Sequence, residues 1–401
     1  MPTLTTRSNW VPLAATLTIQ ALTAMAVLTA PVIAPVVAGA LGVSPAYLGL
    51  YIGIVYVGAM VASLAAGAGV ARFGAIRVSQ AGQLMCAGGL LLCTIPSLWA
   101  FVLGALLIGL GYGPITPASS WLLAQTTPAH RMSLVFSIKQ TGVPVGGMLA
   151  GALVPSVMLL GGWQGALAAV AAANIVCALA SQPLRALLDA DREPGKPLKL
   201  GNLTQPIRLV LSQRTLATLA ACSFIFSTAQ LVLTGYLVTY LSQELAYGLV
   251  AAGLALSVAQ MGGIGGRIVW GVIADRGLGA NRTLAALAFV TAASSLATAL
   301  LHTSMPTLLV FAILFVFGAS ATGWNGVYLA EVARRAPPGM AGIATGGTLA
   351  ITFLGVVLGP PVFGAVSAAF GSFRYGYAAL AIPLLLCGFL LARSRARAAK
   401  A

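Results

Sequence analysis

Apolar residues fill this chain in long, nearly uninterrupted runs, and short polar segments separate one run from the next. A helix needs about 20 apolar residues to cross the hydrocarbon core of a bilayer, so repeated runs of this length predict a polytopic membrane protein. The pattern predicts an all-α membrane protein whose twelve transmembrane helices lie at residues 11–38, 46–70, 76–95, 98–124, 132–160, 163–182, 215–241, 247–274, 283–302, 306–333, 340–369 and 374–393.

One polar segment, residues 183–214, is much longer than the others and is rich in charged residues and proline. It divides the spans into two sets of six. We therefore expect an N-terminal six-helix bundle at 1–182, a linker at 183–214 and a C-terminal six-helix bundle at 215–401.

Charge distribution predicts the topology. Only 7% of the 401 residues are charged, against about 25% in a soluble domain, yet the net charge is +15. Of the 21 lysines and arginines, those in the predicted loops collect on one side of the membrane, with Arg374 as the exception. The positive-inside rule then places both termini and the linker in the cytoplasm of a multi-pass protein in the inner or plasma membrane. The same distribution argues against nucleic acid as a partner.

The sequence offers no signal for an enzyme. The five cysteines lie in apolar runs without metal-ligand spacing, and we find neither a nucleophile–base arrangement nor a Walker-type phosphate loop. We therefore expect no metal and no cofactor, and we expect the chain to act as a monomer in the lipid bilayer.

Two cations lie deep within predicted spans, Lys139 in 132–160 and Arg267 in 247–274. Each is eight residues from the expected cytoplasmic boundary, or about 12 Å at 1.5 Å per residue. A charge at that depth is costly and usually faces a water-filled path and its ligand. The alternative for Arg267 is snorkelling toward the interface. These residues predict a cationic site for an anionic small-molecule substrate.

Other polar and aromatic side chains in the spans are candidates to complete that site. Tyrosine and tryptophan near helix ends also form interfacial belts, whereas an amide at mid-span needs a hydrogen-bond partner. The candidates for substrate contact are Gln20, Gln140, Tyr236, Trp324, Asn325 and Tyr328.

The two halves repeat one another. Gly67, Arg72 and Gly74 mark the end of the second span, and Gly271, Asp275 and Arg276 mark the end of the eighth, with the same spacing from glycine to arginine. Internal repeats of this kind build many secondary transporters.

With this repeat, the central linker and the Gly-Pro-rich stretch at 142–147, the chain resembles the major facilitator superfamily over nearly its full length. The repeated segment resembles the superfamily's G-x-x-x-D-R-x-G loop signature, although Ala71 replaces the usual Asp in the first copy. The resemblance implies two pseudo-symmetric bundles, transport by alternating access, and a cavity where the fifth and eighth helices meet.

Arg267, preceded by Gly266 and followed by Trp270, is similar to the helix-eight arginine of monocarboxylate transporters and oxalate–formate exchangers, which binds the substrate carboxylate. The planar guanidinium suits this role because it bonds a carboxylate bidentately. The chain departs from the monocarboxylate pattern at Gly263, where an Asp partner of the arginine is typical.

The loop signature also suggests a gate. We expect an ion-pair cluster of Asp275, Arg276, Glu331 and Arg334 to latch the second half at the cytoplasmic side. The matching acidic positions of the first half are Ala71 and Gln125, so its latch is expected to be weaker.

Together these features predict a secondary active or facilitative transporter of a small organic anion, most simply a carboxylate. The alternative is a drug/proton antiporter that exports lipophilic compounds. An exporter of cationic drugs would need a carboxylate in the membrane, and none of the six acidic residues lies near a midplane. The sequence leaves open the substrate, the direction of transport, and whether a proton is co-transported.

Overall fold

The computed structural model describes residues 10–127, 132–190, 192–195, 204–337 and 341–398. The predicted linker at 183–214 lies partly outside these residues, as do both chain ends. Within the described residues the structure contains helices and no strand, which confirms the all-α fold.

Among the described residues, hydropathy and length identify ten helical segments able to cross a membrane. One of them, Ile138–Leu188, has 51 residues and turns at Gly162, whose φ of 68° lies outside helical geometry, so it supplies two crossings. A further crossing is α4, Ala75–Leu92, whose apolar character is interrupted by Arg77, Gln80 and Gln83. The structure is thus consistent with the predicted twelve-helix membrane fold.

The chain forms two compact units. The first comprises Met1–Gly42 and Ile54–Gly201, and the second comprises Val43–Gly53 and Asn202–Ala401. The first unit holds α1 (Trp10–Val32), α2 (Ala34–Leu41), most of α3 (Leu48–Phe73), α4, α5 (Leu98–Tyr112), α6 (Ile115–Thr126), α7 (Met132–Gln140), α8 (Gly142–Ala180), the 3₁₀ turn Gln182–Leu184 and α9 (Arg185–Leu188). The second unit holds the 3₁₀ turn Pro45–Tyr47, α10 (Thr204–Ser212), α11 (Arg214–Glu244), α12 (Leu249–Ile273), the π turn Ala274–Leu278, α13 (Ala280–Ala299), α14 (Thr307–Ala321), α15 (Trp324–Arg335), α16 (Ala341–Phe370) and α17 (Phe373–Ala398).

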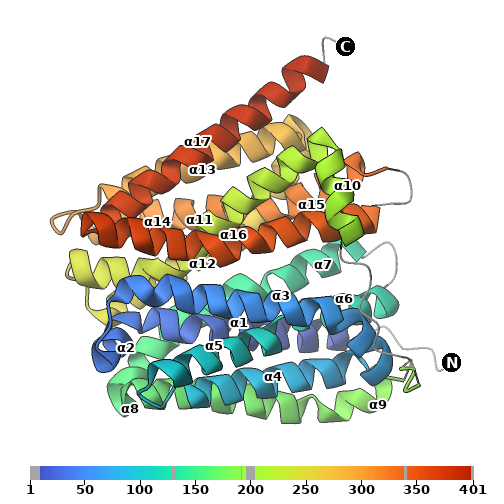
Figure 1. The fold of residues 1–401 in the computed structure, drawn as a ribbon, viewed down its shortest axis with the longest axis horizontal. Helices are drawn as coiled ribbons and strands as arrows, with labels where there is room; N and C mark the ends of the chain where they lie inside the picture. Colours follow the sequence, from blue (N-terminus) through green and yellow to red (C-terminus); the bar gives the residue numbers. More distant parts are fainter. Residues whose placement is uncertain (1–9, 128–131, 191, 196–203, 338–340, 399–401) are drawn as a thin grey trace. The chain divides into compact units, whose positions relative to one another are not determined.

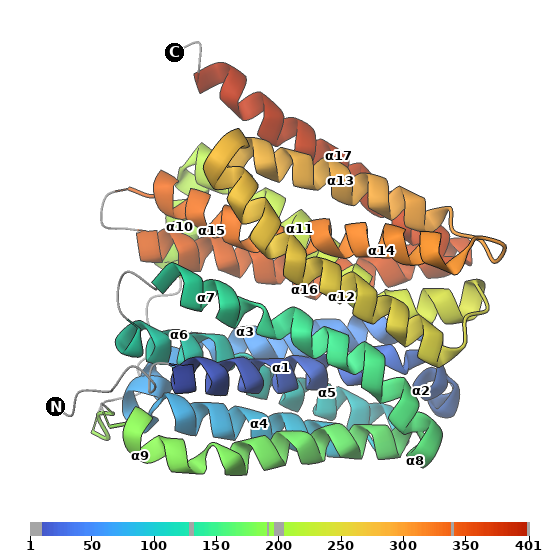
Figure 2. The same ribbon diagram turned by 180° about the vertical axis from the view of Figure 1, so that it is seen from behind.

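Glycines let the helices of each unit approach closely. In the first unit α4 lies beside both α5 and α8 (Figure 1), and a side chain at Gly82 would meet the carbonyl of Gly111 on α5. In the second unit α13 lies beside α17 (Figure 2). Small residues permit such contacts between membrane helices, where van der Waals packing drives association.

Several predicted spans prove to be two helices rather than one. The expected span 132–160 breaks at Thr141, because Pro144 has no N–H for the carbonyl of Gln140 and its ring would clash with that carbonyl. The expected span 98–124 breaks before Pro114. The expected span 306–333 breaks at Thr322 and Gly323 without any proline. These breaks matter because they leave backbone groups available near the candidate site residues.

Candidate functional site

The break between α14 and α15 presents the carbonyl of Thr322 to polar side chains. The Nε of Arg267, on α12, donates a hydrogen bond to this oxygen at 3.2 Å. The Nδ2 of Asn325 donates to the same oxygen at 3.4 Å. An unbroken helix would use the Thr322 carbonyl for the N–H four residues later. The break therefore converts a backbone group into an anchor for a half-buried guanidinium.

Close packing of α12 on α14 and α15 explains why Arg267 reaches this carbonyl. A Cβ at Gly262 would meet the carbonyl of Phe315, and one at Gly266 would meet the carbonyl of Ala319. A Cβ at Gly263 would meet the hydroxyl of Thr322. A larger side chain at position 263 would therefore have to displace Thr322, whose carbonyl accepts from Arg267.

Gln230 of α11 joins this network, and the sequence analysis missed it. Its Oε1 accepts hydrogen bonds from Trp324 Nε1 at 3.2 Å and from Asn325 Nδ2 at 3.3 Å. An indole N–H can only donate, so the oxygen of the Gln230 amide must face it and the amide NH₂ must face elsewhere. Asn325 likewise uses its NH₂ here and keeps its Oδ1 as an acceptor. The rule that a mid-span amide needs a partner could have identified Gln230 as it did Asn325.

Aromatic rings pack behind these polar groups. Trp324 stacks on Phe226, with ring centroids 5.5 Å apart, and meets Tyr328 edge-on at 5.3 Å. Trp324 and Tyr328 are each 1% exposed. Both predicted site residues therefore brace the network from the interior in this structure.

Tyr236, also predicted at the site, belongs to a different cluster of the second unit. Its hydroxyl donates to the carbonyls of Ala46 and Pro360, at 2.9 and 3.2 Å. Its ring packs on Phe363 and Phe373. It lies six residues beyond Gln230 on α11, or about 9 Å along the helix.

The first unit holds the other predicted cation. Lys139 is 1% exposed and lies in the last turn of α7, where the negative end of the helix dipole favours a cation. Gly142, three residues later, packs directly on Gln20 of α1. The Oε1 of Gln20 accepts a hydrogen bond from Thr116 of α6 at 3.1 Å, and its fully buried Nε2 has no partner among the described residues. Gln140, next to Lys139, is half-buried.

The predicted cytoplasmic cluster of the second unit is only partly formed. Glu331 pairs with Arg334 and with Arg335, each at 3.0 Å. Asp275 and Arg276 lie exposed in the π turn after α12, and over the described ranges no ion pair joins them to Glu331. The π turn carries both side chains toward solvent, so this part of the expected cluster is corrected. Gly271 has no neighbouring atom near its Cβ position.

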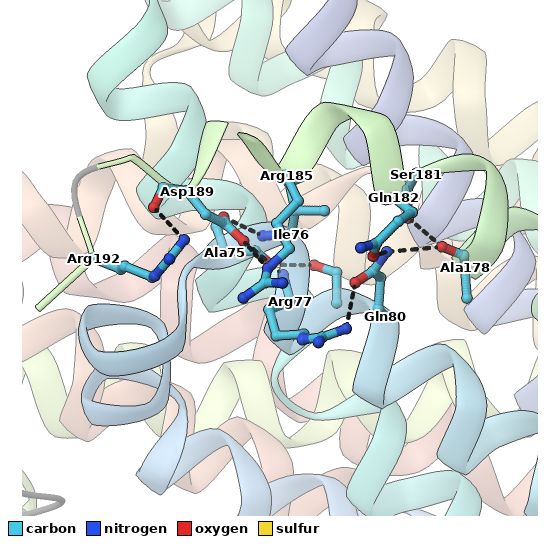
Figure 3. A network of polar contacts seen from close by, with 11 residues as sticks. Ala75, Ile76, Arg77, Gln80, Ala178, Ser181, Gln182, Arg185, Asp189 and Arg192 are labelled. Atoms are coloured by element: carbon cyan, nitrogen blue, oxygen red, sulfur yellow. Dashed lines mark hydrogen bonds and ion pairs between the residues drawn. The ribbon is translucent and has the colours of Figure 1, made fainter. Parts of the chain in front are cut away.

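In the first unit a carboxylate does occupy the matching turn, but it comes from the predicted linker. Asp189 is fully buried and accepts hydrogen bonds from the backbone N–H groups of Ile76, at 2.8 Å, and Arg77, at 3.0 Å (Figure 3). Arg185 pairs with the same carboxylate at 3.9 Å. A Cβ on Gly74 would collide with Asp189. Asp189 thus caps α4 beside the position where Ala71 replaces the usual acid.

The remaining signature residues of the first unit make local contacts. The guanidinium of Arg72 lies 5.3 Å from the ring centroid of Phe73. Gly67 has open space around its Cβ position. The N–H of Glu193 donates to the carbonyl of Ala71 at 2.7 Å, so this part of the linker contacts the end of α3.

Residues 16–360 match the family described as Major Facilitator Superfamily. The chain belongs to this superfamily. It is therefore a multi-pass membrane transport protein for small molecules and not an enzyme.

Individual relatives are distant. The chain is 24% identical over 332 residues to the gentisate transporter of Corynebacterium glutamicum, covering 80% of this chain and 71% of that protein. Its fold is similar to a bacterial homologue of the human lysosomal transporter Spinster, with a TM-score of 0.74 and 16% identity over 95% and 96% of the two chains. A D-xylose–proton symporter is similar with a TM-score of 0.71 and 18% identity over 95% and 96%. The structural likenesses establish the fold alone.

Proposed function

We propose that this protein is a secondary transporter of a small organic anion, most simply a carboxylate. The observation that carries the proposal is the guanidinium of Arg267, half-buried inside a membrane helix and seated on the backbone carbonyl of Thr322. The guanidinium fork carries a positive charge and can bond the carboxylate of a substrate bidentately.

The amide groups around Arg267 extend the same chemistry. Gln230 turns its NH₂ away from Trp324 and so keeps a donor, while Asn325 keeps an acceptor oxygen. Donors suit a carboxylate and an acceptor suits a hydroxyl group. The gentisate transporter relative, named for an organic anion, is consistent with this class of substrate.

Lys139 and Gln20 are proposed as candidate anion contacts within the first unit. A buried amide NH₂ without a described partner is costly, and an anionic group would satisfy it. Helix eight also resembles that of monocarboxylate and oxalate–formate transporters at Gly266 and Arg267. The distribution of basic loops supports a cell-membrane location with both termini in the cytoplasm.

The drug/proton antiporter is the competing function. The described acidic residues of the second unit lie at helix ends, with Glu244 at the end of α11, Asp275 in the π turn and Glu331 paired with two arginines. None is placed to bind a lipophilic cation at mid-span.

A ligand-stabilisation screen separates the two functions. Purified wild-type protein, Arg267→Gln and the matched control Arg276→Gln are heated with mono- and dicarboxylates or with lipophilic cations. A ligand at 100 times its Kd stabilises the folded state by about 2.7 kcal/mol. We expect carboxylates to raise the Tm of the wild type and of Arg276→Gln but not of Arg267→Gln. Stabilisation by lipophilic cations, unchanged in Arg267→Gln, would overturn the organic-anion proposal.

A further inference from the structure

A cavity of about 400 Å³ opens at the turn between α12 and α13, away from the network around Arg267. The first turn of α13 forms one wall and the last turns of α15 form another. Its charged lining consists of Arg282, Arg334, Arg335 and Glu331. Three guanidinium groups face one carboxylate, which gives the lining a net charge of +2.

The cations of this cavity differ in what they already bind. Glu331 is 4% exposed and is bonded to both Arg334 and Arg335. Arg282 is exposed, and within the described ranges it forms neither an ion pair nor a side-chain hydrogen bond. The cavity therefore holds one uncommitted guanidinium beside two that share a single carboxylate.

The repeat-related turn of the first unit shows what such a turn binds. Gly74 precedes α4 with φ 95° and ψ 156°, and Gly279 precedes α13 with nearly the same angles, φ 71° and ψ 160°. In the first unit the N–H groups of the second and third residues of α4 hold the carboxylate of Asp189. The corresponding residues of α13, Asn281 and Arg282, line the cavity instead.

We infer that this cavity binds a phosphate group, with the phosphate occupying at α13 the place that the Asp189 carboxylate occupies at α4. The positive end of a 20-residue helix and three guanidiniums all favour an anion. Arginine forks match the oxygen geometry of a phosphate. The volume exceeds what a single carboxylate oxygen pair needs, which fits a larger headgroup.

A phospholipid headgroup is one source of that phosphate and free phosphate in the cytoplasm is the other. The expected topology puts this turn at the cytoplasmic surface, where the membrane is rich in anionic lipid and where basic pockets between helices bind headgroups. Leu278, which also lines the cavity, is 40% exposed and offers apolar contact to an acyl chain.

The test measures binding to the full-length protein with three probes. Native mass spectrometry titrates phosphatidylglycerol and phosphatidylcholine, and calorimetry titrates inorganic phosphate. Arg282→Gln is the main variant, because among the described residues the Arg282 side chain has no ion pair to lose. Arg276→Gln is its matched control, an exposed cation of the preceding turn that does not line the cavity. Glu331→Gln removes the competing carboxylate.

We expect phosphatidylglycerol to bind more tightly than phosphatidylcholine. Arg282→Gln should weaken that binding about tenfold, equivalent to about 1.4 kcal/mol, and Glu331→Gln should strengthen it by freeing Arg334 and Arg335. Arg276→Gln should leave it unchanged. Binding of inorganic phosphate with the same variant pattern but no preference for phosphatidylglycerol would uphold the phosphate site and assign it to free phosphate. Equal weakening by Arg276→Gln and Arg282→Gln, or no binding of any probe, would overturn the inference.

Discussion

The two units share a turn geometry and use it differently. At Gly74 the first unit buries its own carboxylate, Asp189, against the start of α4, whereas at Gly279 the second unit leaves an open, basic cavity. The cations within the spans differ in the same sense, because Lys139 is 1% exposed and Arg267 is half-buried. At the shared turn, the first unit therefore supplies its own carboxylate, whereas the second unit leaves a cavity.

The largest expected difference is in stability, between a substitution at Gly74, where Asp189 fills the turn, and one at Gly279, where the turn borders the cavity. Both glycines have φ and ψ values that other residues rarely adopt, at a cost of about 1–3 kcal/mol each. Gly74→Ala also displaces Asp189, so we expect about 4 kcal/mol of total destabilisation when about 2 kcal/mol of capping is added. Gly279→Ala meets no atom within 4 Å and should cost only the backbone strain. Thermal unfolding in detergent measures both, and equal losses would contradict the comparison.

The two acidic residues near these turns provide the second contrast. Asp189→Ala removes a buried charge from two backbone donors and should destabilise the protein by about 2 kcal/mol. Asp189→Asn keeps one acceptor and should cost less. Asp275→Ala changes an exposed side chain and should stay within about 0.5 kcal/mol.

Asp275→Ala also tests the latch that the loop signature suggested. If that variant left the rate of transport and the distribution of conformations unchanged, the latch would have no role for Asp275, and Glu331 with its two arginines would be the remaining candidate. Uptake into proteoliposomes and accessibility of introduced cysteines measure the two quantities.

Loss of the charge at Arg267 and loss of the charge at Lys139 should differ in their effects on uptake and on stability. Arg267→Gln removes a charge-assisted bond to substrate worth about 2 kcal/mol, so uptake at low substrate concentration should fall about 30-fold with little change in stability. Lys139→Met should reduce uptake about tenfold while leaving stability equal or higher, because a buried charge no longer has to be desolvated. Uptake and Tm of both variants are measured side by side.

Lys139 also bears on coupling to protons. The sequence places no carboxylate near mid-span, so a co-transported proton would travel with the substrate or on Lys139. Strictly proton-driven uptake by Lys139→Met of a substrate that is anionic at the assay pH would contradict this expectation.

The sequence was sufficient for the features that depend on local pattern. Long apolar runs predicted the membrane fold, and the repeat predicted that the segments ending at Gly74 and at Arg276 correspond. The role of Asp189 could not be predicted from its place in the linker, because its partners Ile76 and Arg77 lie more than 100 residues earlier in the chain. Its signal was indirect: Ala71 left the start of α4 without its usual nearby acid.

The helix break at Thr322 could likewise not be predicted from the positions of prolines. Packing requires a glycine at position 323, because a Cβ there would lie 2.5 Å from the carbonyl of Ala319 and 2.6 Å from the ring of Trp270. Without knowledge of that approach, the sequence predicts one continuous helix and no free carbonyl for Arg267. Gln230 could have been selected as a mid-span amide, but its partners Trp324 and Asn325 depend on which helix faces α11.

The smallest expected effect concerns the open acceptor of the second unit. Asn325 donates its NH₂ to Thr322 and Gln230, so its Oδ1 is left for a hydroxyl donor on the substrate. A neutral hydrogen bond contributes about 1 kcal/mol, so a hydroxylated carboxylate should bind about fivefold more tightly than its deoxy analogue. Asn325→Leu should abolish this preference, whereas Tyr236→Phe, which alters a separate cluster, should retain it. Competition between matched acids in the wild type and both variants measures the ratio. A preference that survived in Asn325→Leu would place the hydroxyl contact elsewhere, and Asn325 would lose its proposed role in the ligand-facing network of the second unit.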